Sequence, residues 1–119
     1  AVIDTSTREV TNRTEVGPNP IQMFATPDGA YVYVANQGTD TEPNNTVSVI
    51  DTATGQVVKT LTTGGGAHGV SASTDGAFVF VTNIADDTVS IIDVGSQEVV
   101  KTVPVGDRPN GIVYGGSSR

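Results

Sequence analysis

Apolar and polar residues alternate along this chain in short runs that are separated by turn signals. The runs Tyr31–Ala35 (YVYVA) and Phe78–Thr82 (FVFVT) place aromatic side chains on one face of a strand and valines on the other. Each run follows an Asp-Gly pair, which is the strongest short signal for a β-hairpin. No segment shows helical periodicity over roughly ten residues or more. The pattern therefore predicts an all-β chain.

The same pattern occurs twice, and part of it occurs a third time. The stretch Thr46–Gly69, TVSVIDTATGQVVKTLTTGGGAHG, returns at Thr88–Gly111 as TVSIIDVGSQEVVKTVPVGDRPNG. A shorter match, Val2-Ile3-Asp4, lies near the beginning of the sequence. A period of roughly forty residues with several strands per unit indicates a β-propeller, in which four-stranded antiparallel sheets, the blades, surround an axis.

Each complete repeat contains four predicted strands, named A to D in chain order. Strand A is Ile21–Thr26 in the first complete repeat and Val70–Ser73 in the second, and strand B is Tyr31–Ala35 and Phe78–Thr82. Strand C is Val47–Ile50 and Val89–Ile92, and strand D is Val57–Leu61 and Val99–Val103. The chain then divides into a partial blade at 1–16, full blades at 17–63 and 64–105, the first strand of a next blade within 106–114 (at Gly111–Tyr114), and a tail at 115–119. Closed propellers have roughly four to eight blades. We therefore expect an incomplete ring, either part of a larger propeller or completed by several copies.

Composition restricts the classes of function. The 119 residues carry a net charge of −7, so their surface repels phosphate backbones and we expect no nucleic acid partner. Cysteine is absent, which excludes disulfides, thiolate metal sites and cysteine nucleophiles. No apolar run approaches the length of a membrane span and no leader peptide is visible, so we expect no transmembrane segment.

The repeat resembles a known family. It reads DGAYVYVANQ…NTVSVIDTATGQVVKTLTTGGGAHG and DGAFVFVTNIADDTVSIIDVGSQEVVKTVPVGDRPNG. This is similar to the YVTN β-propeller repeat of YncE-like and surface-layer-like propellers, and Val81-Thr82-Asn83 reproduces the eponymous motif with Phe80 as its aromatic residue. The resemblance covers almost the whole chain. The chain departs from it by an insertion within Gln37–Asn45 and by Gly65-Gly66-Ala67, where the family usually has a turn containing proline.

The resemblance implies several functions, because the shared motif packs blades and the family includes surface-layer proteins, periplasmic binding proteins and propeller domains of redox enzymes. We expect a non-catalytic binding or scaffolding module outside the cytoplasm (periplasmic, extracellular or on the cell surface). Its loops would contact a protein partner, and its blade edges would allow self-association. One alternative is the propeller part of a redox enzyme or metalloprotein that holds copper or haem near the central channel. A second alternative is a structural surface-layer module.

The propeller fold predicts that two sets of loops lie together at one end of the blades. Loops from D to the next A lie at 17–20, 64–69 and 106–111, and loops from B to C lie at 36–45 and 83–87. Ligand sites in propellers usually lie at this mouth of the channel. His68, the only histidine, is there and is the one candidate ligand for copper or haem. A hydrogen-bonded histidine at the start of an inner strand is the preferred interpretation of His68, and we expect no catalytic residue and no other cofactor ligand.

The insertion is the main departure from blade regularity at this end. Asp40, Glu42 and Asn44 alternate as in calcium-binding loops, but the glycine and distal glutamate of an EF-hand are missing. A solvated loop that contacts a partner is the preferred interpretation. The candidate partner-binding residues are Gln37, Asp40, Glu42, Asn44, Asp86, Asp87, Arg108 and Asn110.

Some polar residues recur in every repeat and are expected to be structural. Asp4, Asp51 and Asp93 each end strand C, and we expect their carboxylates to accept hydrogen bonds from nearby backbone N–H groups. Asn36 and Asn83 each end strand B, and we expect them to close the connection from B to C.

Overall fold

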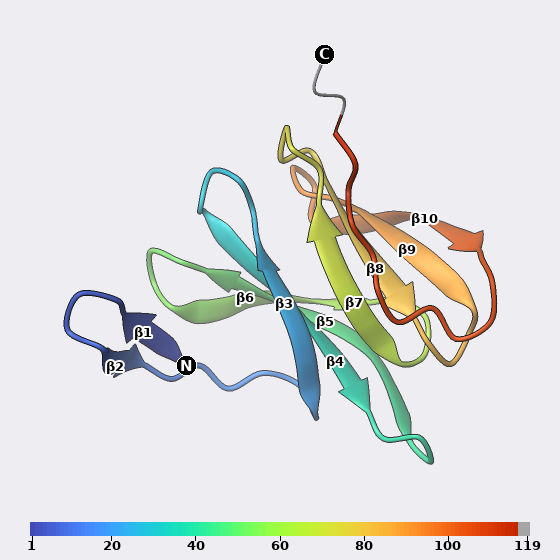
Figure 1. Ribbon diagram of the computed structural model, residues 1–119, viewed down its shortest axis with the longest axis horizontal. Coiled ribbons are helices and arrows are strands. Elements are labelled where there is room, and N and C mark those ends of the chain that lie inside the picture. The colour runs from blue at the N-terminus through green and yellow to red at the C-terminus, as the bar shows by residue number, and fades with distance from the viewer. Residues whose placement is uncertain (117–119) are drawn as a thin grey trace.

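The computed structural model of the chain describes residues 1–116. Within these residues the structure is all-β and contains no helix (Figure 1). The strands are β1 (Val2–Asp4), β2 (Glu9–Asn12), β3 (Pro20–Ala25), β4 (Tyr31–Gly38), β5 (Pro43–Asp51), β6 (Gln56–Thr62), β7 (Ala67–Ala72), β8 (Phe78–Asn83), β9 (Thr88–Asp93) and β10 (Glu98–Pro104). They form a two-stranded sheet, β1-β2, and two four-stranded sheets, β3-β4-β5-β6 and β7-β8-β9-β10.

The two four-stranded sheets repeat one design. Neighbours in sequence are neighbours in each sheet, and every pair is antiparallel. The turns from β3 to β4 and from β7 to β8 each contain the predicted Asp-Gly pair, and Gly29 and Gly76 adopt φ angles of 73° and 72° that favour glycine. The order and pairing predicted for the two complete blades are therefore confirmed. Several strand boundaries differ by a few residues; β7, for example, begins at Ala67 rather than at Val70.

The core lies between the two four-stranded sheets. Tyr33 on β4 and Val49 on β5 are fully buried and belong to one cluster with Val79 and Val81 on β8. The aromatic face of the first sheet thus meets the valine face of the second, as the alternation in the sequence requires. Burial of apolar surface contributes roughly 25 cal/mol per Å², so this contact between the sheets stabilises the segment.

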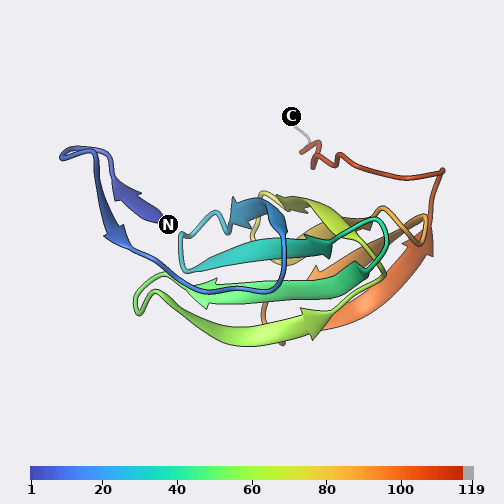
Figure 2. The same cartoon turned by 90° about the horizontal axis from the view of Figure 1, so that it is seen from below.

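The other face of the first sheet is not covered by a sheet. The β1-β2 hairpin lies apart from the two large sheets (Figures 1 and 2), and a cavity of about 420 Å³ separates it from the first sheet. The outer face of the first sheet lines this cavity with Met23, Val32, Val34 and Ile50. The equivalent positions of the second sheet are buried against the first: Val70, Val79, Val81 and Ile92. The outer face is therefore built for packing against another blade, and the ring is incomplete.

Two expectations for irregular segments were wrong. The insertion was expected as a loop at 36–45, but it extends the hairpin of β4 and β5, whose pairing reaches Gly38 and Pro43. Backbone hydrogen bonds continue the strands even though the insertion lacks apolar alternation. The strand expected at Gly111–Tyr114 does not form, because the described chain holds no further strand to pair with it. The predicted tail at 115–119 lies largely outside the described residues.

Residues 1–116 contain no helix that is long and apolar enough to cross a membrane.

Candidate functional site

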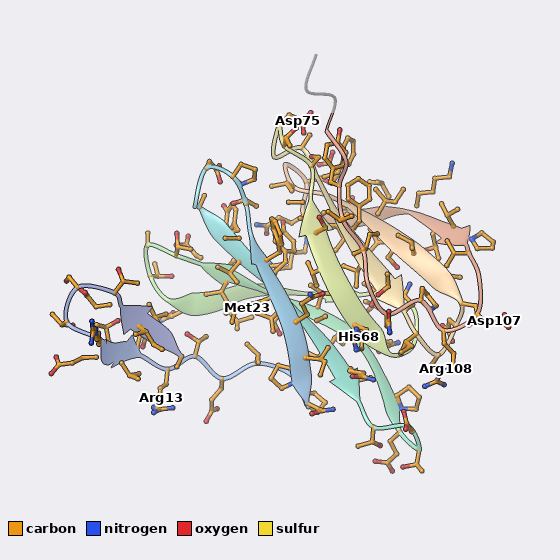
Figure 3. All side chains as sticks on the ribbon, in the orientation of Figure 1. Arg13, Met23, His68, Asp75, Asp107 and Arg108 are labelled. Atoms are coloured by element: carbon orange, nitrogen blue, oxygen red, sulfur yellow. The ribbon has the colours of Figure 1, made fainter. Side chains whose placement is uncertain are left out.

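The predicted loops gather at one end of the two large sheets. This loop-rich end consists of residues 17–19, 37–44, 63–69, 84–87 and 105–111. Backbone hydrogen bonds join the loops to one another: Gly66 N donates to Asn44 O at 2.8 Å, and Ile84 N donates to Gly66 O at 2.9 Å. Figure 3 shows His68, Asp107 and Arg108 at this end and Asp75 at the opposite end. The loops thus form one continuous surface across the boundary between the blades.

The extended β4-β5 hairpin contacts the loops at the end of the second sheet. At its tip Asp40 Oδ1 lies 3.9 Å from an Arg108 guanidinium nitrogen, and both side chains are largely exposed. A shallow depression of about 30 Å³ lies beside this pair, lined in part by Gln37, Pro43 and Ile84. That volume is far below the roughly 300 Å³ or more of typical small-molecule pockets. The surface is therefore suited to contact with another macromolecule more than to enclosing a small ligand.

Asp86 and Asp87 support the neighbouring loops. Asp86 Oδ2 accepts a hydrogen bond from Gly65 N at 2.7 Å. Asp87 Oδ1 accepts one from Arg108 N at 2.8 Å, and Asp87 O accepts a second bond from Val105 N. Both carboxylates therefore hold the chain segments that carry His68 and Arg108 while their exposed edges add negative charge to the loop-rich end.

His68 lies within β7, at the bulge between Ala67 and Val70. Its Nδ1 lies 2.8 Å from the carbonyl oxygen of Asn110. A carbonyl oxygen only accepts hydrogen bonds, so Nδ1 carries a proton, and in the neutral ring Nε2 is therefore the nitrogen with the lone pair. The same carbonyl oxygen lies close over Gly69, where a Cβ atom would stand 2.8 Å from it. The bulge therefore fixes both the tautomer of His68 and the path of residues 106–111.

Two buried asparagines support the loop-rich end from below. Asn36 Nδ2 donates to Thr46 and Ser48 at 3.1 and 3.0 Å, and Asn83 Nδ2 makes the equivalent bonds in the second sheet. Each amide also lies against a glycine of the preceding loop. The predicted role in joining B to C is therefore confirmed, and the contact with the loop from D to A is an additional feature that the sequence did not indicate.

The aspartates at the opposite end are occupied within their own turns. Asp51 Oδ1 accepts from the N–H groups of Ala53 and Thr54, as predicted for the acids that end strand C. At the A-B turns, hydrogen bonds lower the pKa values of Asp28 and Asp75 below the usual 3.8. The hydroxyls of Thr26 and Ser73 have the largest effect, and backbone N–H groups have the next largest. Hydrogen bonds likewise lower the pKa values of Asp4 and Asp93, mainly from the Ser6 side chain and the Ser96 N–H.

The structure brings together most of the residues predicted for the site. Arg108 meets Asp40 and Asp87, and Asn110 meets His68. The remaining candidates lie on the same end but do different work: Gln37 lines the depression, Asn44 Oδ1 accepts from Thr46, and Glu42 N donates to Thr39. Sequence reasoning missed Gln22, whose Oε1 accepts from Val70 N and joins the two sheets. No pattern in the sequence distinguishes that glutamine.

The side chains at this end limit which metal groups would fit. Among residues 1–116 no three or more His, Cys, Asp or Glu side chains gather as a metal site. A closed copper or zinc site would therefore need ligands from elsewhere. Haem iron can be held by a single imidazole, so His68 is the residue that would hold a haem at this end. The role of His68 as a ligand stays a prediction.

Solved structures share this fold. Hydrazine synthase of Kuenenia stuttgartiensis is similar over 87% of this chain and 28% of its own, with a TM-score of 0.74 and 28% identity. Dihydro-haem d1 dehydrogenase NirN, solved with DHE, matches 88% of this chain and 22% of its own (TM-score 0.74, 23% identity). AztD of Citrobacter koseri matches 98% of this chain and 32% of its own (TM-score 0.76, 14% identity). The chain thus spans about a third or less of each of these proteins, and no curated protein matches it.

The family comparison agrees with the repeat pattern and with the sheets. The model of the YncE-like β-propellers matches residues 41–116, which is more than half of the chain and includes the complete second blade. The chain therefore belongs to the YncE-like β-propeller family.

Proposed function

We propose that this segment is a non-catalytic binding module whose loop-rich end contacts a protein partner. The observation that carries the proposal is the extended β4-β5 hairpin, which is the one large break in the repeat and joins loops of both blades into a single surface. The depression on that surface is too small for an ordinary ligand. A broad, irregular and exposed surface on a rigid sheet scaffold is typical of protein recognition.

The charges at the loop-rich end favour a partner with a basic surface. Asp40, Glu42, Asp86, Asp87 and Asp107 are balanced only by Arg108 and, when protonated, His68. Complementary charge speeds encounter between proteins and weakens with added salt. The family resemblance and the absence of cysteine are compatible with a location outside the cytoplasm, which is part of the proposal.

Site-specific photo-crosslinking tests the proposal in the native protein, in extracts of the organism that makes it. A crosslinking amino acid at Thr39, at the hairpin tip, should capture one discrete protein. The matched control carries the same amino acid at Thr54, in the β5-β6 turn at the opposite end. Equal capture from both positions, or none from Thr39, would contradict the proposal.

A loop exchange then measures the contribution of the hairpin. Residues 37–45 are replaced by a copy of residues 84–87, which make the same connection in the second blade. The sheet should form as before, because the donor sequence already joins equivalent strands. Affinity for the purified captured protein should fall by about tenfold or more, since the hairpin supplies the centre of the surface. Unchanged affinity would remove the hairpin from the interface.

A second candidate function rests on the geometry of His68. Its Nδ1–H donates to Asn110 O, so Nε2 is the atom through which His68 would hold a haem, and a bound haem would supply redox chemistry. Haem added to the protein should give a visible spectrum that changes in a His68→Ala variant. A spectrum that does not respond to this substitution would exclude His68 as the ligand.

A further inference from the structure

We propose that Asn110-Gly111 is a site of self-catalysed deamidation, and that His68 assists the reaction. The modification converts Asn110 to aspartate and isoaspartate with water as the only co-reactant. This proposal is independent of the proposed function, because it rests on the covalent chemistry of one peptide unit and its neighbours.

The reaction needs an accessible backbone and an attacking nitrogen that is not hydrogen-bonded, and this segment provides both. Residues 110–116 form no strand, and Asn110 and Gly111 are both exposed. Gly111 N donates no hydrogen bond to any group in the described part of the chain. A Cβ atom at Gly111 would meet nothing within 4 Å, so the space around the attacking nitrogen is open. Glycine also permits the backbone angles that ring closure requires.

The chemistry balances without an external catalyst. Gly111 N attacks Cγ of the Asn110 side chain, loses its proton, and forms a five-membered succinimide. The side-chain nitrogen takes up that proton and leaves as ammonia. Water then opens the ring at either carbonyl, which gives aspartate or, with the backbone rerouted through the side chain, isoaspartate.

His68 contacts the peptide unit that reacts. Its Nδ1–H donates to the carbonyl oxygen of Asn110, which belongs to the same amide as the attacking nitrogen of Gly111. A donor on this oxygen withdraws electron density from the amide and makes the Gly111 N–H more acidic. The close approach over Gly69 holds the oxygen in place. His68 is therefore a positioning residue that polarises the reactive amide.

The product would alter the loop-rich end. A carboxylate would stand beside Asp107 and Arg108 in a loop that is already acidic. Isoaspartate would also add one methylene group to the backbone between residue 110 and Gly111, and the carbonyl oxygen that His68 contacts would become part of a free carboxylate. Both changes act on the loop that carries Arg108.

The test follows deamidation site by site in the full chain. Protein is incubated at neutral pH and digested with trypsin, which releases residues 102–119 with Asn110 as the only asparagine. Residues 60–101 are released from the same sample and hold only Asn83, which is fully buried in β8 and serves as an internal control. Mass spectrometry should show the replacement of amide by hydroxyl at Asn110, with an isoaspartate product resolved by chromatography, and none at Asn83. Equal modification of the two peptides, or an intact Asn110, overturns the site.

Two variants of His68 test whether its side chain accelerates deamidation of Asn110. His68→Phe should slow the reaction by about three- to tenfold, the range that corresponds to one hydrogen bond of ordinary net strength. His68→Gln keeps a donor and should restore most of the rate. In urea, where the contact is lost, all three proteins should react at one rate. If His68→Phe reacts as fast as the parent protein under native conditions, the role of His68 is wrong.

Discussion

Asn36 and Asn83 show how single side chains support the loop-rich end. Each amide bridges two strands and lies directly under a glycine of the loop from D to A. At Gly64 a Cβ atom would stand 2.8 Å from the Asn83 amide. Gly106 is the equivalent position of the next repeat, and a Cβ atom there would meet nothing within 4 Å. The repeat therefore contains its own control for this contact.

Gly64→Ala should destabilise the protein, whereas Gly106→Ala should not. The added methyl group forces the Asn83 amide away from its two hydroxyl partners, and crowding of this kind costs about 1–3 kcal/mol. At Gly106 the substitution only reduces the freedom of the unfolded chain, so stability stays unchanged or rises slightly. Urea unfolding of the two variants measures the difference. Equal effects would show that the glycine-asparagine contact contributes nothing.

Tyr33 is a second residue whose environment leads to a prediction about stability. Its hydroxyl is buried and has no hydrogen-bond partner among the described residues, and burial, aided by Tyr31 and Asp93, raises the pKa of Tyr33 to about 12. The second blade has Phe80 at this position. Tyr33→Phe should leave stability unchanged or raise it by about 1 kcal/mol, because an unsatisfied polar group is removed. A clear loss of stability on urea unfolding would mean that the hydroxyl has a partner.

The same tyrosine gives an alkaline pH dependence. The unfolded chain loses the Tyr33 proton near pH 10, whereas the folded chain keeps it until about pH 12. Between these values the folded state binds more protons, so the free energy of unfolding falls as the pH rises. Tyr33→Phe should flatten this decline. An equally steep decline in the variant would assign the alkaline loss to other groups.

At the scale of strands and turns, the alternation of side chains predicted the regular elements well. YVYVA and FVFVT became β4 and β8, and their aromatic and valine faces meet as expected. Alternation does not report backbone pairing, however, so the continuation of β4 and β5 through the insertion was missed. Alternation also does not indicate which side chains from distant parts of the sequence contact each other in the fold. The loop-rich end was predicted, but the contacts of Arg108 with Asp40 and of His68 with Asn110 were not.

The A-B turns add a prediction at acid pH. Their hydroxyl and N–H donors lower the pKa values of Asp28 and Asp75 in the folded state, so the stability that these carboxylates contribute is present above the usual pKa of 3.8 and is lost as the pH falls through the lower folded values. Asp75→Asn keeps an acceptor oxygen but does not titrate. The free energy of unfolding should therefore fall less at acid pH in this variant than in the parent protein. Unfolding experiments at decreasing pH measure the difference. An unchanged acid profile would contradict the turn assignment.

For the whole molecule, the two large sheets behave as neighbouring blades of a ring that this chain does not complete. The outer face of the first sheet exposes Met23 at 62%, whereas the equivalent Val70 of the second sheet is 2% exposed. Large apolar surfaces of this kind associate in water. The propeller fold and family are established by the repeat, the sheets and the comparisons, and the missing neighbours determine how the segment behaves alone.

The most direct test is the native mass of the isolated 119-residue chain, measured by light scattering over a range of concentrations. If the outer face is a blade-packing surface, the chain should associate beyond its monomer mass of 12.2 kDa, and Met23→Glu should reduce that association. A strictly monomeric chain whose exposed faces also bind no apolar dye would contradict the assignment of these sheets as blades of an incomplete propeller.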